Sequence, residues 1–119
     1  MKQEDCIFCK IVRGEILSKK IYEDNNFIAI LDINPVGEGH SLVIPKKHFR
    51  NLLDFPSTLG TELLDALKKV SLNLIKEYKA DGINMGINNE ESAGQVVFHT
   101  HFHLLPRKKG DGIKIMQKC

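Results

Sequence analysis

Apolar residues recur at helical spacing through the middle of the chain. Between residues 59 and 78 they lie three or four positions apart, at Leu59, Leu63, Leu67, Val70, Leu74 and Tyr78. This spacing places all of them on one face of an α-helix. The pattern therefore predicts a long amphipathic helix over about residues 56–79, ended by Asp81-Gly82.

A shorter helical pattern lies near the start of the chain. Four apolar side chains there have helical spacing: Ile7, Phe8, Ile11 and Val12. Asp5 is a suitable N-cap, because a carboxylate can accept hydrogen bonds from the first N–H groups of a helix. Gly14 suits the position that follows the last turn. We predict a short helix over about residues 5–13.

Short apolar stretches bounded by turn-forming residues predict β-strands. Three precede the long helix, over residues 20–23, 27–31 and 40–44, with Pro45 limiting the third. Residues 84–88 follow the helix, and a polar loop separates them from a strand over residues 95–105 that stops at Pro106. One short helix, one long helix and about five strands predict an α+β domain with an antiparallel sheet.

Composition and charge narrow the class of protein. The chain has 119 residues, 42% of them hydrophobic, which suits a single domain over residues 1–119 with a solvated basic tail from residue 107. A net charge of only +2 argues against a nucleic-acid partner. No apolar run approaches the ~20 residues of a membrane span, and no secretory signal is visible, so no membrane partner is expected. Three cysteines, an odd number, favour a reducing, cytoplasmic location.

Three of the five histidines, His99, His101 and His103, alternate along the last predicted strand. Alternate residues of a strand share one face, and buried imidazoles need polar partners. One interpretation is an exposed strand with histidine as filler. Another is a metalloenzyme centre, and a third uses the imidazoles as a nucleophile and as partners for phosphate. The row spans roughly 13 Å, too far for one metal ion, so we expect one end to meet a metal and the rest a substrate.

Four motifs follow one another along the chain: Cys6-Ile7-Phe8-Cys9-Lys10-Ile11, Asp32-Ile33-Asn34-Pro35, the segment from Gly39 to His48, and Gly94 to Leu105 with its alternating histidines. Together they resemble the histidine triad (HIT) family, in particular the zinc-containing bacterial branch of its nucleotide-binding proteins. The likeness covers about residues 6–107. It implies the HIT fold, dimerising into one ten-stranded sheet, with the long helix near the interface.

The resemblance also implies an activity. Members of the family bind purine nucleotides and transfer or hydrolyse nucleotidyl groups. His101 matches the nucleophile that would form a nucleotidyl-histidine, which water then hydrolyses to release the nucleoside monophosphate. His103 matches the phosphate-binding histidine, and His40 the upstream histidine that supports it. Gln95 matches the glutamine on the leaving-group side of the phosphate.

The nucleoside end follows from the same likeness. Asp32 matches the acidic residue that accepts hydrogen bonds from the ribose hydroxyls, and Asn88 matches an asparagine that meets phosphate or ribose. Four apolar residues fall where the family lines its base pocket: Ile7, Phe8, Ile33 and Leu42. Taken alone, these four would be assigned to the core, and Asn88 to a turn.

The zinc branch accounts for two of the cysteines. Cys6 and Cys9 match its C-x-x-C motif, and His48 and His99 match its histidine ligands. Two thiolates and two imidazoles form a closed tetrahedral set, as in structural zinc sites. A C-x-x-C pair can instead be redox-active, but no thioredoxin-like βαβ pattern surrounds this one.

One position departs from the wider family. Many relatives carry Ser or Thr directly after the glutamine, where this chain has Val96. No hydroxyl can then help to protonate a leaving amine, so a leaving group other than an amine comes into question. Two further functions stay open: a dinucleoside polyphosphate hydrolase, and a non-catalytic module that binds or scaffolds nucleotides.

Overall fold

The computed structural model describes residues 3–115 of the chain. Within them, five strands form one antiparallel sheet in the order β1-β2-β3-β5-β4. The strands are β1 (Lys20–Glu23), β2 (Phe27–Leu31), β3 (Ser41–Pro45), β4 (Gly82–Gly86) and β5 (Phe102–Arg107). The predicted α+β architecture with a five-stranded antiparallel sheet is confirmed.

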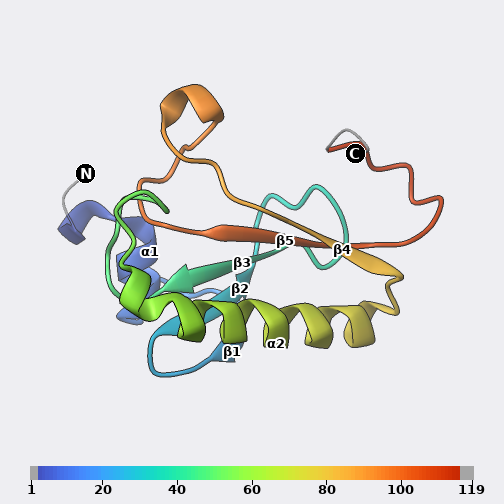
Figure 1. Ribbon diagram of the computed structural model, residues 1–119, viewed down its shortest axis with the longest axis horizontal. Coiled ribbons are helices and arrows are strands. Elements are labelled where there is room, and N and C mark those ends of the chain that lie inside the picture. Colours follow the sequence, from blue (N-terminus) through green and yellow to red (C-terminus); the bar gives the residue numbers. More distant parts are fainter. Residues whose placement is uncertain (1–2, 116–119) are drawn as a thin grey trace.

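Helices lie on both faces of this sheet (Figure 1). The long helix α2 (Gly60–Tyr78) follows a 3-10 turn, η2 (Ser57–Leu59), and packs on one face against Phe27, Ala29 and Val43. The short helix α1 (Ile7–Val12) packs on the other face, against the alternate strand residues. Because strand side chains alternate between faces, β2 and β3 supply both cores, and their burial is nearly complete.

The apolar face predicted for the long helix is confirmed within a single chain. Val70 and Leu74 are buried, and Leu63, Leu67 and Tyr78 pack at the edge of the same core. Other leucines of α2, Leu64 and Leu72, point outward and are more than half exposed. The sheet of the same chain therefore satisfies the predicted face, with no need for a second copy.

Two helix ends are capped differently from the prediction. The N-cap of α1 is Cys6, whose Sγ accepts the N–H of Cys9 at 3.4 Å, while Asp5 belongs to a preceding 3-10 turn, η1 (Gln3–Asp5). The helix α2 ends at Lys79, which takes the left-handed conformation (φ 52°) usually left to glycine. Gly82, predicted to close that helix, is instead the first residue of β4. In each case a side chain or backbone contact outcompeted the expected capping residue.

The last strand is shorter at its start and longer at its end than predicted. Only Phe102–Arg107 pair with neighbouring strands, and Pro106 lies inside the strand, opposite Ile83. The missing N–H of Pro106 is tolerated because β3 pairs with β5 no further than Leu104. Before Phe102, the backbone and hydroxyl of Thr100 both donate to the Phe49 carbonyl, at 2.7 and 3.0 Å. Residues 95–101 are therefore held by hydrogen bonds to the loop that contains Phe49, and they do not pair with the sheet.

Helices in the part of the chain between residues 3 and 115 lack the combination of length and apolar character that a membrane span requires.

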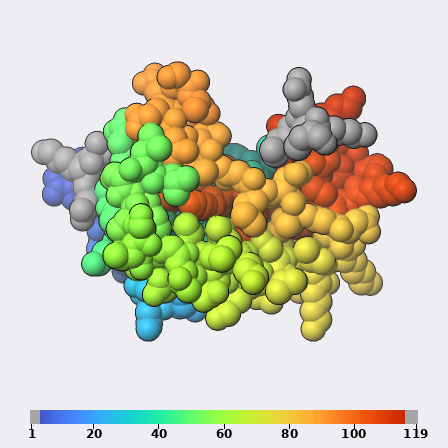
Figure 2. Space-filling model, in the orientation of Figure 1, coloured from blue at the N-terminus to red at the C-terminus, as the bar shows by residue number. Residues whose placement is uncertain are grey.

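The loop before β5 contains a 3-10 turn, η3 (Glu91–Ala93). In Figure 2 this loop rises beside a depression whose other side is the segment that follows β5.

Candidate functional site

Strand register brings an apolar row and a histidine together on the face of the sheet that α1 partly covers. Ile30 of β2 lies opposite Leu42 of β3, and Leu42 lies opposite His103 of β5. Neighbouring strands are about 4.8 Å apart, so Ile30 and His103 are roughly 10 Å apart across the sheet. A ligand with an apolar end and a polar end can therefore span this row.

His40 and His103 form a hydrogen-bonded pair whose proton positions follow from their surroundings. The Val36 N–H donates to Nδ1 of His40 at 3.2 Å, so in neutral His40 the proton is on Nε2. That Nε2 lies 2.9 Å from Nδ1 of His103 and donates to it. In neutral His103 the remaining proton is consequently on Nε2, which is left as a donor for a ligand such as a phosphate oxygen.

His101 has the opposite arrangement. Its Nδ1 donates to the backbone carbonyl of His99 at 2.8 Å, which leaves Nε2 with a free lone pair. The ring packs edge-on against Phe8 at 5.1 Å and lies 5.1 Å from the ring of His103, both measured between centroids. A neutral imidazole with one nitrogen fixed by a carbonyl is the form that acts as a nucleophile.

Burial keeps these imidazoles neutral at pH 7. It lowers the pKa of His103 to about 4, and the neighbouring His101 and His40 add to the effect. Burial also lowers the pKa of His101, although its bond to the His99 carbonyl acts in the opposite direction. The pKa of His40 is lowered by burial too, opposed by the carboxylate of Asp32, whose Oδ2 is 3.6 Å from His40 Nε2.

These shifts predict a stability that depends on pH. The unfolded chain protonates His103 near its ordinary pKa of 6.5, whereas the folded chain does so only near 4. The unfolded state then binds more protons between these values, so the free energy of unfolding falls as the pH drops from about 6.5 towards 4. We expect urea unfolding to show this loss, with a shallower pH dependence in His103→Asn. An identical pH dependence in the two proteins would contradict the prediction.

A second cluster lies at the other end of the histidine row. Cys6, Cys9, His48 and His99 place one possible ligand atom each within 4.8 Å of one another. His99 Nδ1 is 3.2 Å from Cys6 Sγ and 3.5 Å from Cys9 Sγ, and His48 Nδ1 is 3.3 Å from Cys9 Sγ. Tetrahedral zinc with ordinary bond lengths separates its nitrogen and sulfur ligands by about 3.5 Å. The four residues therefore fit a zinc ion.

The surroundings of the cluster support the same assignment. His99 Nε2 donates to the Pro45 carbonyl at 2.8 Å, so the free lone pair of neutral His99 is on Nδ1, facing the sulfurs. Cys6 and Cys9 are both buried, and burial, reinforced by the nearby Cys6, raises the pKa of Cys9 to about 11. Buried thiols need a cation to ionise, and a metal supplies one. All four ligands come from the protein, which suits a structural site.

Asp32, His40 and His103 also lie close enough together to suggest a metal. Their hydrogen bonds favour a different interpretation. The facing nitrogens, His40 Nε2 and His103 Nδ1, share one proton, because Val36 occupies the other nitrogen of His40. The lone pair that a metal would need on His40 therefore carries a proton. These observations favour a hydrogen-bonded pair over a metalloenzyme centre.

The residues predicted at the nucleoside end have different degrees of exposure. Phe8 and Leu42 are buried beside His101 and His103, whereas Ile7 and Ile33 are 41% and 84% exposed. Asp32 is partly buried, and its Oδ1 accepts the N–H of Asn34 at 2.9 Å. Phe8 and Leu42 thus lie beside the histidines and Ile7 and Ile33 are more exposed, while the contact of these four residues with a nucleotide stays a prediction.

Gln95 and Asn88 belong to a network that ties two loops together. The buried Gln95 accepts from Asn51 (3.1 Å) and from the Glu90 N–H (2.8 Å), and it donates to the carbonyls of Arg50 (2.7 Å) and Val97 (3.1 Å). Its amide is therefore fully bonded within the protein. Asn88 is exposed and donates to the Gly94 carbonyl at 3.4 Å.

Sequence reasoning missed the residues that connect these loops. Both oxygens of Glu90 bind the Arg50 guanidinium, at 2.8 Å each, and one also accepts from Asn51. The partners are 40 positions apart in the chain, and nothing in the local pattern marks them. Their effect is to fix the segment that leads into His99 and His101.

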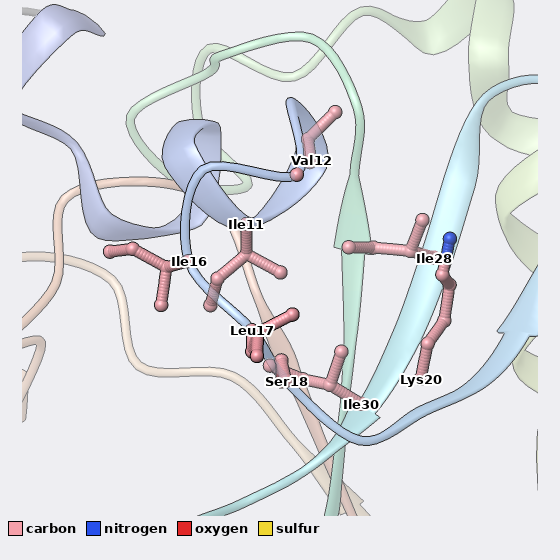
Figure 3. Close-up of a pocket in the computed structure, with 9 residues that line it drawn as sticks. Ile11, Val12, Ile16, Leu17, Ser18, Lys20, Ile28 and Ile30 are labelled. Carbon is pink, nitrogen blue, oxygen red and sulfur yellow. The ribbon is translucent and has the colours of Figure 1, made fainter.

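A hollow of about 210 Å³ lies at the apolar end of the row. Figure 3 shows aliphatic side chains of α1, the following loop and β2 around it. Ile11, Ile28 and Ile30 form its inner wall, and the highly exposed Leu17 stands at its rim. The sequence predicted Ile11 in a helix and Ile28 and Ile30 in a strand, without a binding role, and assigned Leu17 to no element. Their proximity to Leu42 could be recognised only from the strand register.

Comparison with known proteins identifies the family. Residues 13–110 match the HIT domain family. The chain belongs to the HIT family. It is 44% identical over 109 residues to the adenylylsulfatase HINT3 of Arabidopsis thaliana, a match that covers 92% of this chain and 55% of that protein. The chain thus spans about half the length of this relative.

Solved HIT structures agree with the fold. A protein from Streptococcus mutans superimposes with a TM-score of 0.90 at 49% identity, covering 97% of this chain and 73% of that one. A zinc-bound histidine triad family protein from Mycobacterium smegmatis gives a TM-score of 0.89 at 38% identity, covering 98% and 85%. This HIT protein carries the buried Cys/His cluster of the zinc-containing branch.

Proposed function

We propose that this HIT protein is a nucleotide hydrolase or nucleotidyl transferase that acts through a covalent nucleotidyl-His101 intermediate. Its substrates would be purine nucleoside phosphoramidates or related nucleotidyl compounds. The observation that carries the proposal is the bond from His101 Nδ1 to the His99 carbonyl, which leaves a lone pair on Nε2 inside a buried cluster of neutral imidazoles. The 44% identity to an adenylylsulfatase supports a hydrolytic activity on a nucleotidyl compound.

In the first step, Nε2 of His101 attacks the α-phosphorus, a P–N bond forms, and the leaving group departs with its electron pair. The Nε2–H of His103 donates to a phosphate oxygen as negative charge builds there. In the second step, water attacks phosphorus, the P–N bond breaks, His101 leaves as neutral imidazole, and the proton lost by the water passes to solvent, giving the nucleoside monophosphate. Two displacements of lower barrier replace one difficult displacement.

The apolar row of Ile30 and Leu42 offers a surface for the nucleoside. In the proposal, a purine base would lie against the aliphatic hollow at Ile11, Ile28 and Ile30, with Phe8 and Leu42 between this hollow and the histidines. Asp32 lies beside His40 and offers a carboxylate oxygen to the ribose hydroxyls. In this arrangement Ile7, Ile33 and Asn88 contact the nucleotide from the rim, and the direct contact predicted for Gln95 requires its amide to exchange an internal bond.

Zinc at Cys6, Cys9, His48 and His99 would serve a structural purpose, because four protein ligands leave no open position for substrate. Two residues, His99 and Phe8, connect this metal cluster to His101. His99 supplies the carbonyl that orients His101, and Phe8, which packs against His101, lies between the two cysteines in α1.

The leaving group is the least constrained part of the substrate. Val96 is 82% exposed and has no hydroxyl with which to protonate a departing amine. A group that departs as a stable anion, such as sulfate or a nucleotide, needs no such proton. Adenylyl sulfate and dinucleoside polyphosphates are therefore second candidates, and the adenylylsulfatase among the relatives favours the former.

A substrate panel tests the proposal. Wild-type protein is incubated with adenosine 5′-phosphoramidate, adenylyl sulfate and diadenosine polyphosphate, and AMP release is followed by chromatography. We expect AMP from at least one of them, and acid quenching during turnover to trap a nucleotidyl adduct visible by mass spectrometry. Binding of AMP with no turnover of any substrate would favour a non-catalytic nucleotide-binding module instead.

The homodimer stays a prediction. The edge strands of the described sheet are β1 and β4, so a ten-stranded sheet would require one of them to pair with its copy. On β4, Met85 is 44% exposed, and the outward leucines of α2 are available to the same interface. Light scattering would measure the oligomeric state.

A further inference from the structure

The loop that carries three of the predicted site residues, Asp32, Ile33 and His40, has little secondary structure of its own. Residues 32–40, here called the 32–40 loop, join β2 to β3 without a helix or strand. Its two ends are tied by the Asp32 N–H, which donates to the His40 carbonyl at 2.9 Å, and His40 N–H donates to Gly37 at 3.2 Å. The tip of the loop therefore depends on contacts with other segments for its position.

The segment after β5 folds back towards this loop. Residues 107–113, here called the 107–113 strap, are closed by the Arg107 guanidinium, which donates to both oxygens of Asp111 (2.8 and 2.9 Å) and to the Ile113 carbonyl (2.6 Å). Asp111 also accepts the N–H groups of Lys108 and Ile113, at 3.1 and 3.0 Å. These bonds, that of Arg107 first, hold the pKa of Asp111 far below its usual range. Arg107 also binds Asn84 of β4 at 2.6 Å, which anchors the strap to the sheet.

One apolar side chain of the strap, Ile113, packs against the loop. A Cβ placed on Gly37 would lie 2.7 Å from Cδ1 of Ile113 and 3.1 Å from Cδ1 of Leu105, so both side chains press against the Gly37 backbone. Close by, a Cβ on Gly39 would lie 2.8 Å from the Tyr78 ring and 2.9 Å from Pro106. The body of the domain therefore supports the loop at Gly39, whereas at Gly37 the strap, through Ile113, shares the support with Leu105 of β5.

The supported stretch sets the state of the histidine pair. Val36, next to Gly37, gives the N–H that fixes the proton of His40 on Nε2, and His40 in turn donates to His103. If Val36 moved away, His40 could carry its proton on either nitrogen, and His103 would lose its defined donor. The lysine–glutamate contact between strap and loop, Lys108 to Glu38 at 3.9 Å, is exposed and adds little.

We infer that the 107–113 strap is a positioning element of the active site: Ile113, held by the Arg107–Asp111 pair, presses on Gly37 and thereby keeps the Val36 N–H on His40. This gives a role to a segment that the sequence marked only as a solvated basic tail. Its catalytic consequence rests on the proposed function, while its effect on His40 does not.

The test compares Ile113→Ala with two controls in the full-length, zinc-loaded protein. Ile113→Leu keeps a side chain with Cδ atoms that can reach Gly37, and Lys109→Ala changes an exposed residue of the same strap. Imidazole ¹⁵N shifts report which nitrogen of His40 carries the proton, in the absence of any nucleotide. We expect a single His40 tautomer in the wild type and both controls, and a mixture of tautomers in Ile113→Ala.

Turnover of the substrate identified by the panel gives a second measurement. Ile113→Ala should lower kcat by about tenfold, because small misplacements of catalytic groups cost up to about 100-fold in rate. Ile113→Leu, which keeps Cδ atoms, should restore it. Unchanged His40 tautomers in Ile113→Ala would overturn the inference, whatever the activity. If the His40 tautomers shift in Ile113→Ala while wild-type protein turns over no substrate, the positioning role of the strap is supported and the proposed function is contradicted.

Discussion

Replacing His101 with asparagine is expected to abolish release of nucleoside monophosphate while leaving nucleotide binding nearly intact. The Asn side chain can still donate to the His99 carbonyl in place of Nδ1, so the local backbone should be retained. It has no lone pair suited to attack phosphorus, however, and the covalent route is lost. Removal of a covalent nucleophile typically lowers kcat by at least about 10³-fold.

The measurement is AMP release by His101→Asn beside the wild type, on whichever substrate of the panel is cleaved. AMP affinity by calorimetry should change by only a few-fold, and the mass of the trapped adduct should disappear. Lys68→Ala, on the exposed surface of α2, is the matched control and should behave as the wild type. Release of AMP by His101→Asn at the wild-type rate would show that another group attacks phosphorus.

The second large effect is expected at the metal cluster. In Cys6→Ser, a buried ligand is replaced by a hydroxyl that binds zinc poorly, and the remaining thiol and imidazoles lose the ion that holds them together. Cys6 is also the N-cap of α1 and contacts His99, so the substitution would weaken both the start of the helix and its contact with the histidine row. Each kcal/mol lost lowers the Tm of a domain this size by about 4 °C, and loss of a structural metal should lower it by more than about 10 °C.

Zinc content by elemental analysis and thermal unfolding check this prediction. Wild-type protein should hold one zinc per chain, Cys6→Ser almost none, and His101→Asn the same as the wild type. Chelation of the wild type should reproduce the low Tm of Cys6→Ser. One zinc per chain in Cys6→Ser would contradict the assignment, and a Cys6–Cys9 disulfide in the purified, metal-free wild type would favour the redox alternative.

The alternating histidines show how far the sequence could lead. Their spacing predicted that His99, His101 and His103 share one side, and the structure agrees, since Phe8 packs edge-on against both His99 and His101. The expected metal end is supported, because His99 lies in the cysteine cluster, whereas the substrate end, where His103 pairs with His40, stays a prediction. The strand predicted over residues 95–105 was wrong for its first part, because residues 95–101 are not a strand.

Other features depended on partners far away in the chain, and local patterns carry no signal for these. Thr100 is held by Phe49, Arg50 by Glu90, and Gly37 by Ile113. A local propensity for turn or strand cannot reveal which backbone carbonyl will accept a given N–H. The same limit explains the misplaced helix boundaries at Asp5 and Gly82, where a cysteine sulfur and a left-handed lysine took the capping positions.

The amino-acid sequence alone determined the helices and strands with strong periodicity and the alternating row of imidazoles, because these patterns are local. The four metal ligands, spread from Cys6 to His99, followed from the resemblance to the HIT family. The tertiary structure alone decided which nitrogen of each imidazole carries its proton: His101 by the His99 carbonyl, His40 by Val36, and His99 by Pro45. Proton positions depend on the three-dimensional neighbours of each ring, and those neighbours exist only after the sheet and its loops have formed.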